Sequence, residues 1–141
     1  MNLLHQAITW IIEHPDQFNR ALMQHLVMSI TAIVFALAIG LPLAVVILRS
    51  RIAAAAAINS VNGLRTLPSL AILAIMMPIL GIGLWPSIVA LTILALPPIL
   101  INAYIGLRDV DADAIEAATG MGMSERQILR KIRIPLAAPA M

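Results

Sequence analysis

The sequence predicts an all-helical protein that crosses a membrane about three times and carries a polar pair of short helices near its C-terminal end. Of its 141 residues, 61% are hydrophobic and 11% are charged, and the mean hydropathy is +0.97. Soluble domains carry roughly a quarter charged residues, so this chain lacks the polar surface to cover itself in water. Long apolar runs, separated by short basic, proline and glycine segments, mark the candidate membrane helices.

The first candidate membrane helix covers residues 26–48, which contain no charged side chain. At about 1.5 Å per residue this run extends roughly 34 Å, enough to cross a hydrocarbon core of about 30 Å. It exceeds the roughly 7–15 residues of a signal-peptide core and has no basic n-region, so we expect it to be retained. Residues 1–21 place apolar side chains at helical spacing around Trp10, which predicts an external interfacial amphipathic helix ended by Pro15.

Four small residues repeat every fourth position along this first span and share one helical face. They are Ala32, Ala36, Gly40 and Ala44. Small side chains let two helix backbones approach closely in lipid, so we predict that this face packs against another helix. The alternative is that alanine is simply common in this stretch.

The second and third spans are predicted at about residues 64–84 and 87–107. Pro68 suits a helix start, whereas Pro78 predicts a break in the second span, which is expected to continue part of an alanine-rich stretch near the membrane surface. An uncharged turn at residues 81–86 is expected outside. Pro97 and Pro98 predict a kink in the third span, because each removes a backbone donor; this kink either faces a pathway or only shapes the packing.

The basic residues give the topology. Of nine lysines and arginines, only Arg20 precedes the first span. Cytoplasmic loops are enriched in Lys and Arg, so we predict an external N-terminus and a cytoplasmic end of the third span at Arg108.

Residues 109–135 have the pattern of neither a membrane span nor a plain connector. Asp111 or Asp113 can cap a first short helix, and Gly120 and Gly122 are expected to end it with a sharp reversal. A capping-box pair, Ser124 and Gln127, then opens a second helix. In this basic amphipathic helix, Ile128, Leu129 and Ile132 form an apolar stripe that is expected to bury in a partner or in the segment's own packing. The helix is expected to end at Pro135, because proline disfavours helix in the residue before it.

These residues also carry a resemblance. Glu116-Ala117-Ala118, three residues, Gly122, nine residues and then Ile132-Arg133-Ile134-Pro135 resembles the EAA loop of ATP-binding-cassette (ABC) importer permeases, with Ile134 where leucine is usual. We call residues 109–135 the EAA-like segment. The resemblance implies a cytoplasmic helix pair that seats in a groove of an ATPase subunit. The residues it implies for ATPase coupling are Glu116, Ala117, Ala118, Gly122, Ile128, Ile132 and Pro135. The alternative is an ordinary juxtamembrane helix whose arginines face lipid phosphates.

A second set of matches narrows the resemblance. Residues 64–71 (LRTLPSLA), 81–83 (GIG), 97–100 (PPIL) with Asn102 and Tyr104, and 120–124 (GMGMS) look like the osmoprotectant branch, whose permeases import glycine betaine, choline and carnitine. The resemblance implies that residues 22–141 form a permease domain in a bacterial inner membrane. The implied partners are a cytoplasmic ATPase, a second permease chain, an external substrate-binding protein and membrane lipid. About two further helices usually follow the EAA loop, so the chain is expected to be a fragment or a truncated protein.

Several other functions are disfavoured. No Gly-rich Lys-Ser or Lys-Thr phosphate loop is present, so ATP hydrolysis would need a separate subunit. We therefore expect no enzymatic activity, no cofactor and no nucleic-acid partner. His5, His14 and His25 do not pair with carboxylates at ligand spacing, so no metal site is expected. A small secondary transporter is disfavoured because the spans lack ionisable residues; a truncated, non-transporting membrane remnant remains the alternative.

Overall fold

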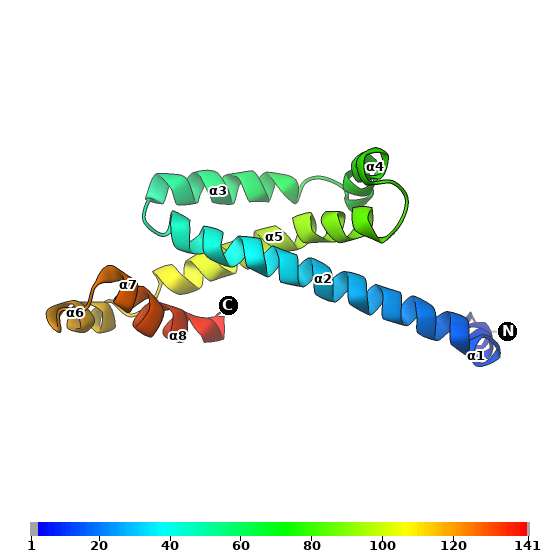
Figure 1. Cartoon of the computed structure of the whole chain (residues 1–141), viewed down its shortest axis with the longest axis horizontal. Coiled ribbons are helices and arrows are strands. Elements are labelled where there is room, and N and C mark those ends of the chain that lie inside the picture. Colours follow the sequence, from blue (N-terminus) through cyan, green and yellow to red (C-terminus); the bar gives the residue numbers. More distant parts are fainter. Residues whose placement is uncertain (1–2, 141) are drawn as a thin grey trace.

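The computed structural model describes residues 3–140, apart from the side chains of Leu4 and Ala140, and every element in that range is a helix. The all-α prediction is confirmed. Met1, Asn2 and Met141, which the predicted domain boundaries include, lie outside the described residues. The helices form an elongated bundle built around two long crossing helices, with the EAA-like segment at one end and the N-terminal helix at the other (Figure 1).

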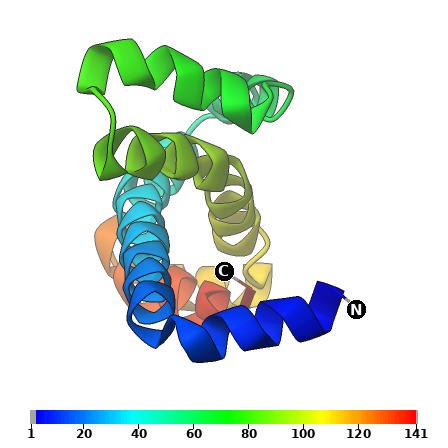
Figure 2. The same cartoon turned by 90° about the vertical axis from the view of Figure 1, so that its right-hand side faces the viewer.

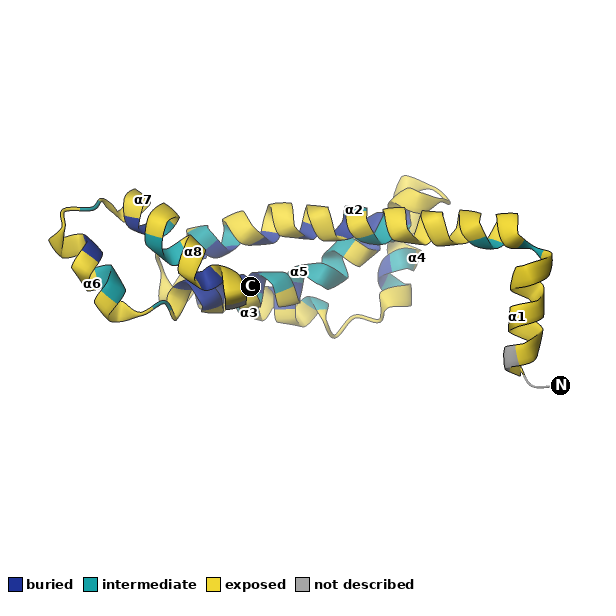
Figure 3. Cartoon of the chain, turned by 90° about the horizontal axis from the view of Figure 1, so that it is seen from below, coloured by how far each residue is buried: buried dark blue, intermediate teal, exposed yellow. Residues whose placement is uncertain are grey.

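Two helices are long and apolar enough to cross a membrane: α2 (Pro15–Ile47) and α5 (Leu84–Arg108). A third crossing is made only if α3 (Arg51–Leu64) and α4 (Ser69–Leu80) count as one span, since the pair is bent by 90°. The structure therefore has two clear candidate spans and one sharply bent helix pair. Apolar side chains on the outer faces of the bundle are exposed, whereas the inner faces are buried (Figure 3), which is the pattern expected of lipid-facing helices.

The N-terminal region is divided differently from the predicted boundary at residue 21. Helix α1 (Leu3–Glu13) ends before Pro15, and residues 15–21 already form the first turns of α2. Proline is favoured at the first helical position because its fixed φ suits the helix and its missing donor is not needed there. Figure 3 shows α1 turning away from α2 at this corner. The 33 residues of α2 extend about 50 Å, so α2 is longer than the predicted span.

The break in the second span lies at residues 65–68, so the predicted break at Pro78 is wrong. The amides of Arg65, Thr66 and Leu67 each donate to the carbonyl three residues earlier, which tightens the chain before Pro68 caps α4. Pro78 lies inside α4, in its final turn. The alanine-rich stretch forms α3, which runs back alongside α2 and α5 (Figure 1); its place near the membrane surface stays a prediction.

Helix α5 continues through Pro97 and Pro98 without an interruption and bends along its length (Figure 2). Pro97 is fully buried in the bundle. The main core forms where α2, α3 and α5 meet the C-terminal residues of the chain. Its buried members are Ala44, Ile47, Ala54, Val61, Leu100, Ala103, Tyr104, Leu107 and Ala137. Because Ala137 belongs to this core, the chain that follows the EAA-like segment folds back onto α5.

Candidate functional site: the EAA-like segment and its attachment

The first part of the EAA-like segment is α6 (Ala112–Gly120). Asp111 caps it, with its Oδ1 accepting from the Asp113 amide at 3.0 Å. This cap satisfies one of the amides that a helix N-terminus leaves without a partner. Glu116 and Ala117 are exposed, whereas Ala118 is buried. The Glu-Ala-Ala motif therefore exposes the carboxylate of Glu116 and the methyl group of Ala117, whereas Ala118 packs against the rest of the protein.

The reversal after α6 depends on Gly122. Its φ is +80°, a left-handed conformation that strains any residue with a Cβ. The amide of Gly122 donates to the Thr119 carbonyl at 2.9 Å, and the amide of Met123 donates to the Ala118 carbonyl at 3.1 Å. This pair of bonds is the Schellman motif, which satisfies the last carbonyls of a helix. Gly120 is the last residue of α6 and has no positive φ, so of these two glycines Gly122 is the one whose backbone requires glycine.

The second helix of the segment begins with the predicted capping box. The Ser124 amide donates to Oε1 of Gln127 at 2.8 Å, and α7 (Glu125–Ile128) follows. Ile128 is buried and Ile132 half-buried, whereas the neighbouring Arg126 and Arg130 are exposed. The apolar stripe therefore faces the protein, and Arg126 and Arg130 face outward.

Pro135 does not end this helix, so that prediction is wrong. The helical run widens into a π-helix, η1 (Leu129–Arg133), and continues through α8 (Ile134–Ala137) and a short 3₁₀ turn, η2 (Ala138–Ala140). The Ile134 amide donates five residues back, to Leu129. This wider turn relieves the clash that a proline ring makes with the carbonyl four residues before it. Pro135 is exposed, near the start of α8.

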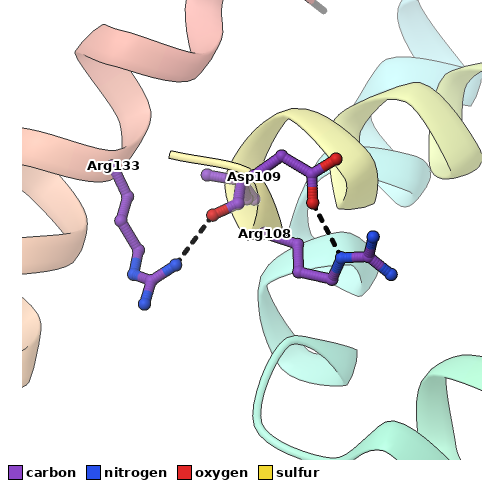
Figure 4. Close-up of polar contacts among 4 residues, drawn as sticks. Arg108, Asp109 and Arg133 are labelled. Carbon is purple, nitrogen blue, oxygen red and sulfur yellow. Dashed lines mark hydrogen bonds and ion pairs between the residues drawn. The ribbon is translucent and has the colours of Figure 1, made fainter. Parts of the chain in front are cut away.

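A side-chain bond joins this second helix to the end of α5. Nη1 of Arg133 donates to the Leu107 carbonyl at 2.8 Å (Figure 4). Leu107 lies in the last turn of α5, where carbonyls have no partner inside the helix. In the sequence Arg133 stands out only as part of the motif, and this contact is not readable there because its partner lies 26 positions earlier in the chain.

Between the EAA-like segment and the end of α2 lies a groove of about 420 Å³. Its walls include Val45 at the end of α2, Leu48 and Arg49 just after it, Ile115 and Thr119 of α6, and Ile128, Leu129 and Arg133 of the second helix. The segment is therefore not packed solidly against α2. The main contacts with α5 at this end of the bundle are made by α8 and η2, the helical residues with which the segment ends and continues.

The four small residues of the first span all lie on the face of α2 that meets α5, and all are buried. At Gly40 a Cβ atom would lie 2.8 Å from Cγ2 of Ile99 and 3.6 Å from the backbone nitrogen of Leu100. Near the other end of this contact, Oγ1 of Thr92, which donates to the Ile88 carbonyl at 2.7 Å, lies 3.4 Å from the Ala32 carbonyl. We call this contact, formed by Ala32, Ala36, Gly40 and Ala44 against α5, the small-residue seam.

The histidines give no sign of a metal centre. Within residues 3–140 no group of three or more His, Cys, Asp or Glu side chains is placed to hold a metal ion. His14 instead stacks on Trp10, with ring centroids 5.2 Å apart, at the corner between α1 and α2.

Comparison with known proteins decides the family. Residues 32–141 match the family model of the binding-protein-dependent transport system inner membrane component, a range that includes both the small-residue seam and the EAA-like segment. The chain belongs to this family. The family resemblance inferred from the motif is therefore confirmed.

Curated permeases of this family resemble the chain over nearly its whole length. It is 45% identical to the carnitine transport permease protein OpuCB of Listeria monocytogenes over 91% of this chain and 59% of that protein. It is 36% identical to the choline transport system permease protein OpuBB of Bacillus subtilis over 96% of this chain and 63% of that protein. The chain spans about three fifths of the length of these curated relatives.

A solved structure supports the fold. The methionine ABC transporter MetNI, in inward-facing conformations, contains a chain that superposes with a TM-score of 0.69 at 29% sequence identity. The match covers 84% of this chain and 61% of that one. The permease fold of the family is thus present in the described helices.

Proposed function

We propose that the chain is a membrane permease subunit of an ABC-type uptake system for osmoprotectants of the glycine betaine, choline and carnitine class. The family model and the names of the similar permeases support this proposal. The substrates named for those relatives are quaternary amines, which proteins bind chiefly through aromatic cages. Only 4% of this chain is aromatic, so primary selection is assigned to an external substrate-binding protein.

The observation that carries the proposal is the construction of the EAA-like segment. It presents exposed Glu116 and Ala117 on a helix held by Asp111 and Gly122, at the end of the bundle where α2 and α5 terminate (Figure 1). In this proposal Glu116 is the polar anchor in a groove of a separate ATPase subunit, and Ala117 permits close approach. The rest of the implied set, Ala118, Gly122, Ile128, Ile132 and Pro135, shapes the helix pair.

Arg133 and α8 provide the mechanical link in this mechanism. When the ATPase subunits close, the EAA-like segment moves with them, and its bond to the Leu107 carbonyl carries that movement to α5. The loosely filled groove beside α2 leaves room for the segment to change its angle. Access to the pathway then switches from the outside to the inside, with ATP hydrolysed entirely by the partner.

The orientation follows from the same scheme. The N-terminus and α1 lie outside, residues 22–141 form the permease domain, and residues 109–135 lie in the cytoplasm. A second permease chain, identical or related, completes the pathway in a bacterial inner membrane. The basic ends of α2 and α5, with Arg49, Arg51 and Arg108, agree with this orientation under the positive-inside rule.

Site-directed cross-linking tests the assignment directly, because the chain has no cysteine of its own. Met121, 74% exposed at the tip of the reversal, is replaced by cysteine and cross-linked to the ATPase subunit in membranes. We expect a specific adduct, reduced about tenfold by Glu116→Arg, since like charge or lost pairing at a buried contact costs more than 1.4 kcal/mol. The matched control is Glu13→Arg, the same change at an exposed site on α1.

The outcomes separate the candidate functions. Equal adduct yields for Glu116→Arg and Glu13→Arg would contradict the coupling assignment. A normal adduct with no uptake by the fully assembled system, binding protein and second permease included, would favour the non-transporting membrane remnant.

A further inference from the structure

A second groove, of about 600 Å³, shares no lining residue with the groove between the EAA-like segment and the end of α2. It is formed where α3 begins and α5 ends. Its lining residues are Arg51, Ala54, Ala55, Ile58, Tyr104 and Arg108. This lining holds two guanidinium groups and no carboxylate. Neither the predicted packing face nor the EAA-like segment includes any of these residues.

The position of the Arg108 guanidinium is defined by two contacts. Its central carbon lies 5.8 Å from the centroid of the Tyr104 ring, a distance at which a cation is attracted by the ring face. Its Nε donates to Oδ1 of Asp109 at 2.8 Å (Figure 4). Asp109 thus engages Nε and offsets part of the charge of Arg108.

Arg51 stands on the other wall as the first residue of α3. Ser50 caps this helix, with its Oγ accepting from the Ala53 amide at 3.3 Å. The N-terminus of a helix carries a partial positive charge, which adds to that of Arg51. Arg51 of α3 and Arg108 of α5 therefore line the same groove. The N-terminus of α3 adds a positive electrostatic potential that favours an anion.

The remaining lining is apolar and extends in one direction from the arginines. Ala54 and Ala55 lie one turn further along α3 and Ile58 lies two turns further, on a helix that runs back alongside α2 and α5 (Figure 1). If α2 and α5 cross the bilayer, the arginines lie at its surface and the alanines and Ile58 lie deeper. The groove is thus cationic at the level of lipid head groups and apolar at the level of acyl chains.

We propose that this groove binds an anionic membrane phospholipid, with its phosphate between Arg51 and Arg108 and an acyl chain along Ala54, Ala55 and Ile58. Arginine holds phosphate oxygens through paired N–H donors, and basic pockets between membrane helices at the cytoplasmic face suit such head groups. The proposal rests on the membrane setting of the proposed function and not on transport or on the ATPase. A free phosphate ion would bind the two arginines in the same way, but it would leave Ala54, Ala55 and Ile58 uncovered.

Lipid selectivity near the groove tests the proposal. Ile52, an exposed α3 residue outside the lining, is replaced by cysteine and labelled with a fluorophore, and the protein is placed in phosphatidylcholine vesicles. We expect stronger quenching by nitroxide-labelled phosphatidylglycerol than by nitroxide-labelled phosphatidylcholine. Replacing both Arg51 and Arg108 by glutamine should lower this preference by roughly fivefold for each arginine. Unlabelled phosphatidylglycerol should compete with the labelled lipid.

The control removes the same charge elsewhere. Arg126→Gln with Arg130→Gln changes two exposed arginines of the EAA-like segment and should leave the preference intact. Arg51→Lys with Arg108→Lys should keep part of the preference for phosphatidylglycerol that the glutamine variant loses. An equal loss in the control pair would mean a diffuse surface charge and would overturn the site. Competition by inorganic phosphate as strong as that of phosphatidylglycerol would also overturn it, as would an absence of preference in the unmodified chain.

Discussion

The small-residue seam and the EAA-like segment are built on opposite principles. In the seam the residues of α2 are small, so the backbones of α2 and α5 approach closely. A larger side chain at almost any of these positions would meet a neighbouring residue. The EAA-like segment is held by local backbone caps at Asp111, Gly122 and Ser124, and its outer surface is free of close neighbours. Added volume should therefore damage the seam, whereas altered backbone conformation should damage the segment.

The largest effect is expected at Gly40. A Cβ there would already lie 2.8 Å from Ile99, and Gly40→Val adds two more methyl groups. Overpacking of this kind costs about 1–3 kcal/mol, so we expect a clearly lower midpoint of thermal unfolding in detergent. Gly63→Val is the matched control, because nothing lies within 4 Å of a Cβ at Gly63 in α3. Equal destabilisation by the two variants would contradict the close approach of α2 and α5.

An intermediate effect is expected at Gly122. Nothing lies within 4 Å of an added Cβ there, so any cost of Gly122→Ala comes from its φ of +80° and not from volume. A left-handed conformation costs roughly 1–2 kcal/mol for a residue with a Cβ. The Met123 amide, which donates to Ala118, should then exchange its hydrogen about tenfold faster.

Gly120→Ala provides the comparison for Gly122→Ala. Gly120 is helical, and nothing lies within 4 Å of its added Cβ, so this variant should leave exchange at Met123 unchanged or slower. Similar acceleration in both variants would mean that the reversal does not depend on the left-handed glycine.

The same contrast explains what could be predicted from sequence. Asp111, Gly122, Ser124 and Gln127 act on partners within five positions, so their patterns were readable along the chain. The position of the 90° bend is not readable from the prolines alone, because α4 continues through Pro78 whereas the chain bends in the tight turns before Pro68. The π-helix before Pro135 was missed for a similar reason, since proline alone does not tell whether a helix ends or widens.

Arg133 links the EAA-like segment to the membrane helices, because it lies in the segment and donates to the Leu107 carbonyl at the end of α5. Removing one hydrogen bond from a half-buried group changes folding stability by about 0.5–1.5 kcal/mol, so Arg133→Ala should lower the unfolding midpoint least of the three variants. Under the proposed function its effect on coupling should be larger. The ATPase should still associate and hydrolyse ATP, while uptake per ATP hydrolysed falls, because movement of the segment no longer reaches α5 through this bond.

Arg130→Ala removes an equal charge from an exposed position and should preserve the ratio of uptake to ATP hydrolysed, and Arg133→Lys should recover part of that ratio. If Arg133→Ala and Arg130→Ala lower the ratio alike, the loss is one of surface charge and α8 alone joins the segment to the spans. If Arg133→Ala leaves the ratio intact, the bond is structural and the movement travels through the packing of Ala137 in the core.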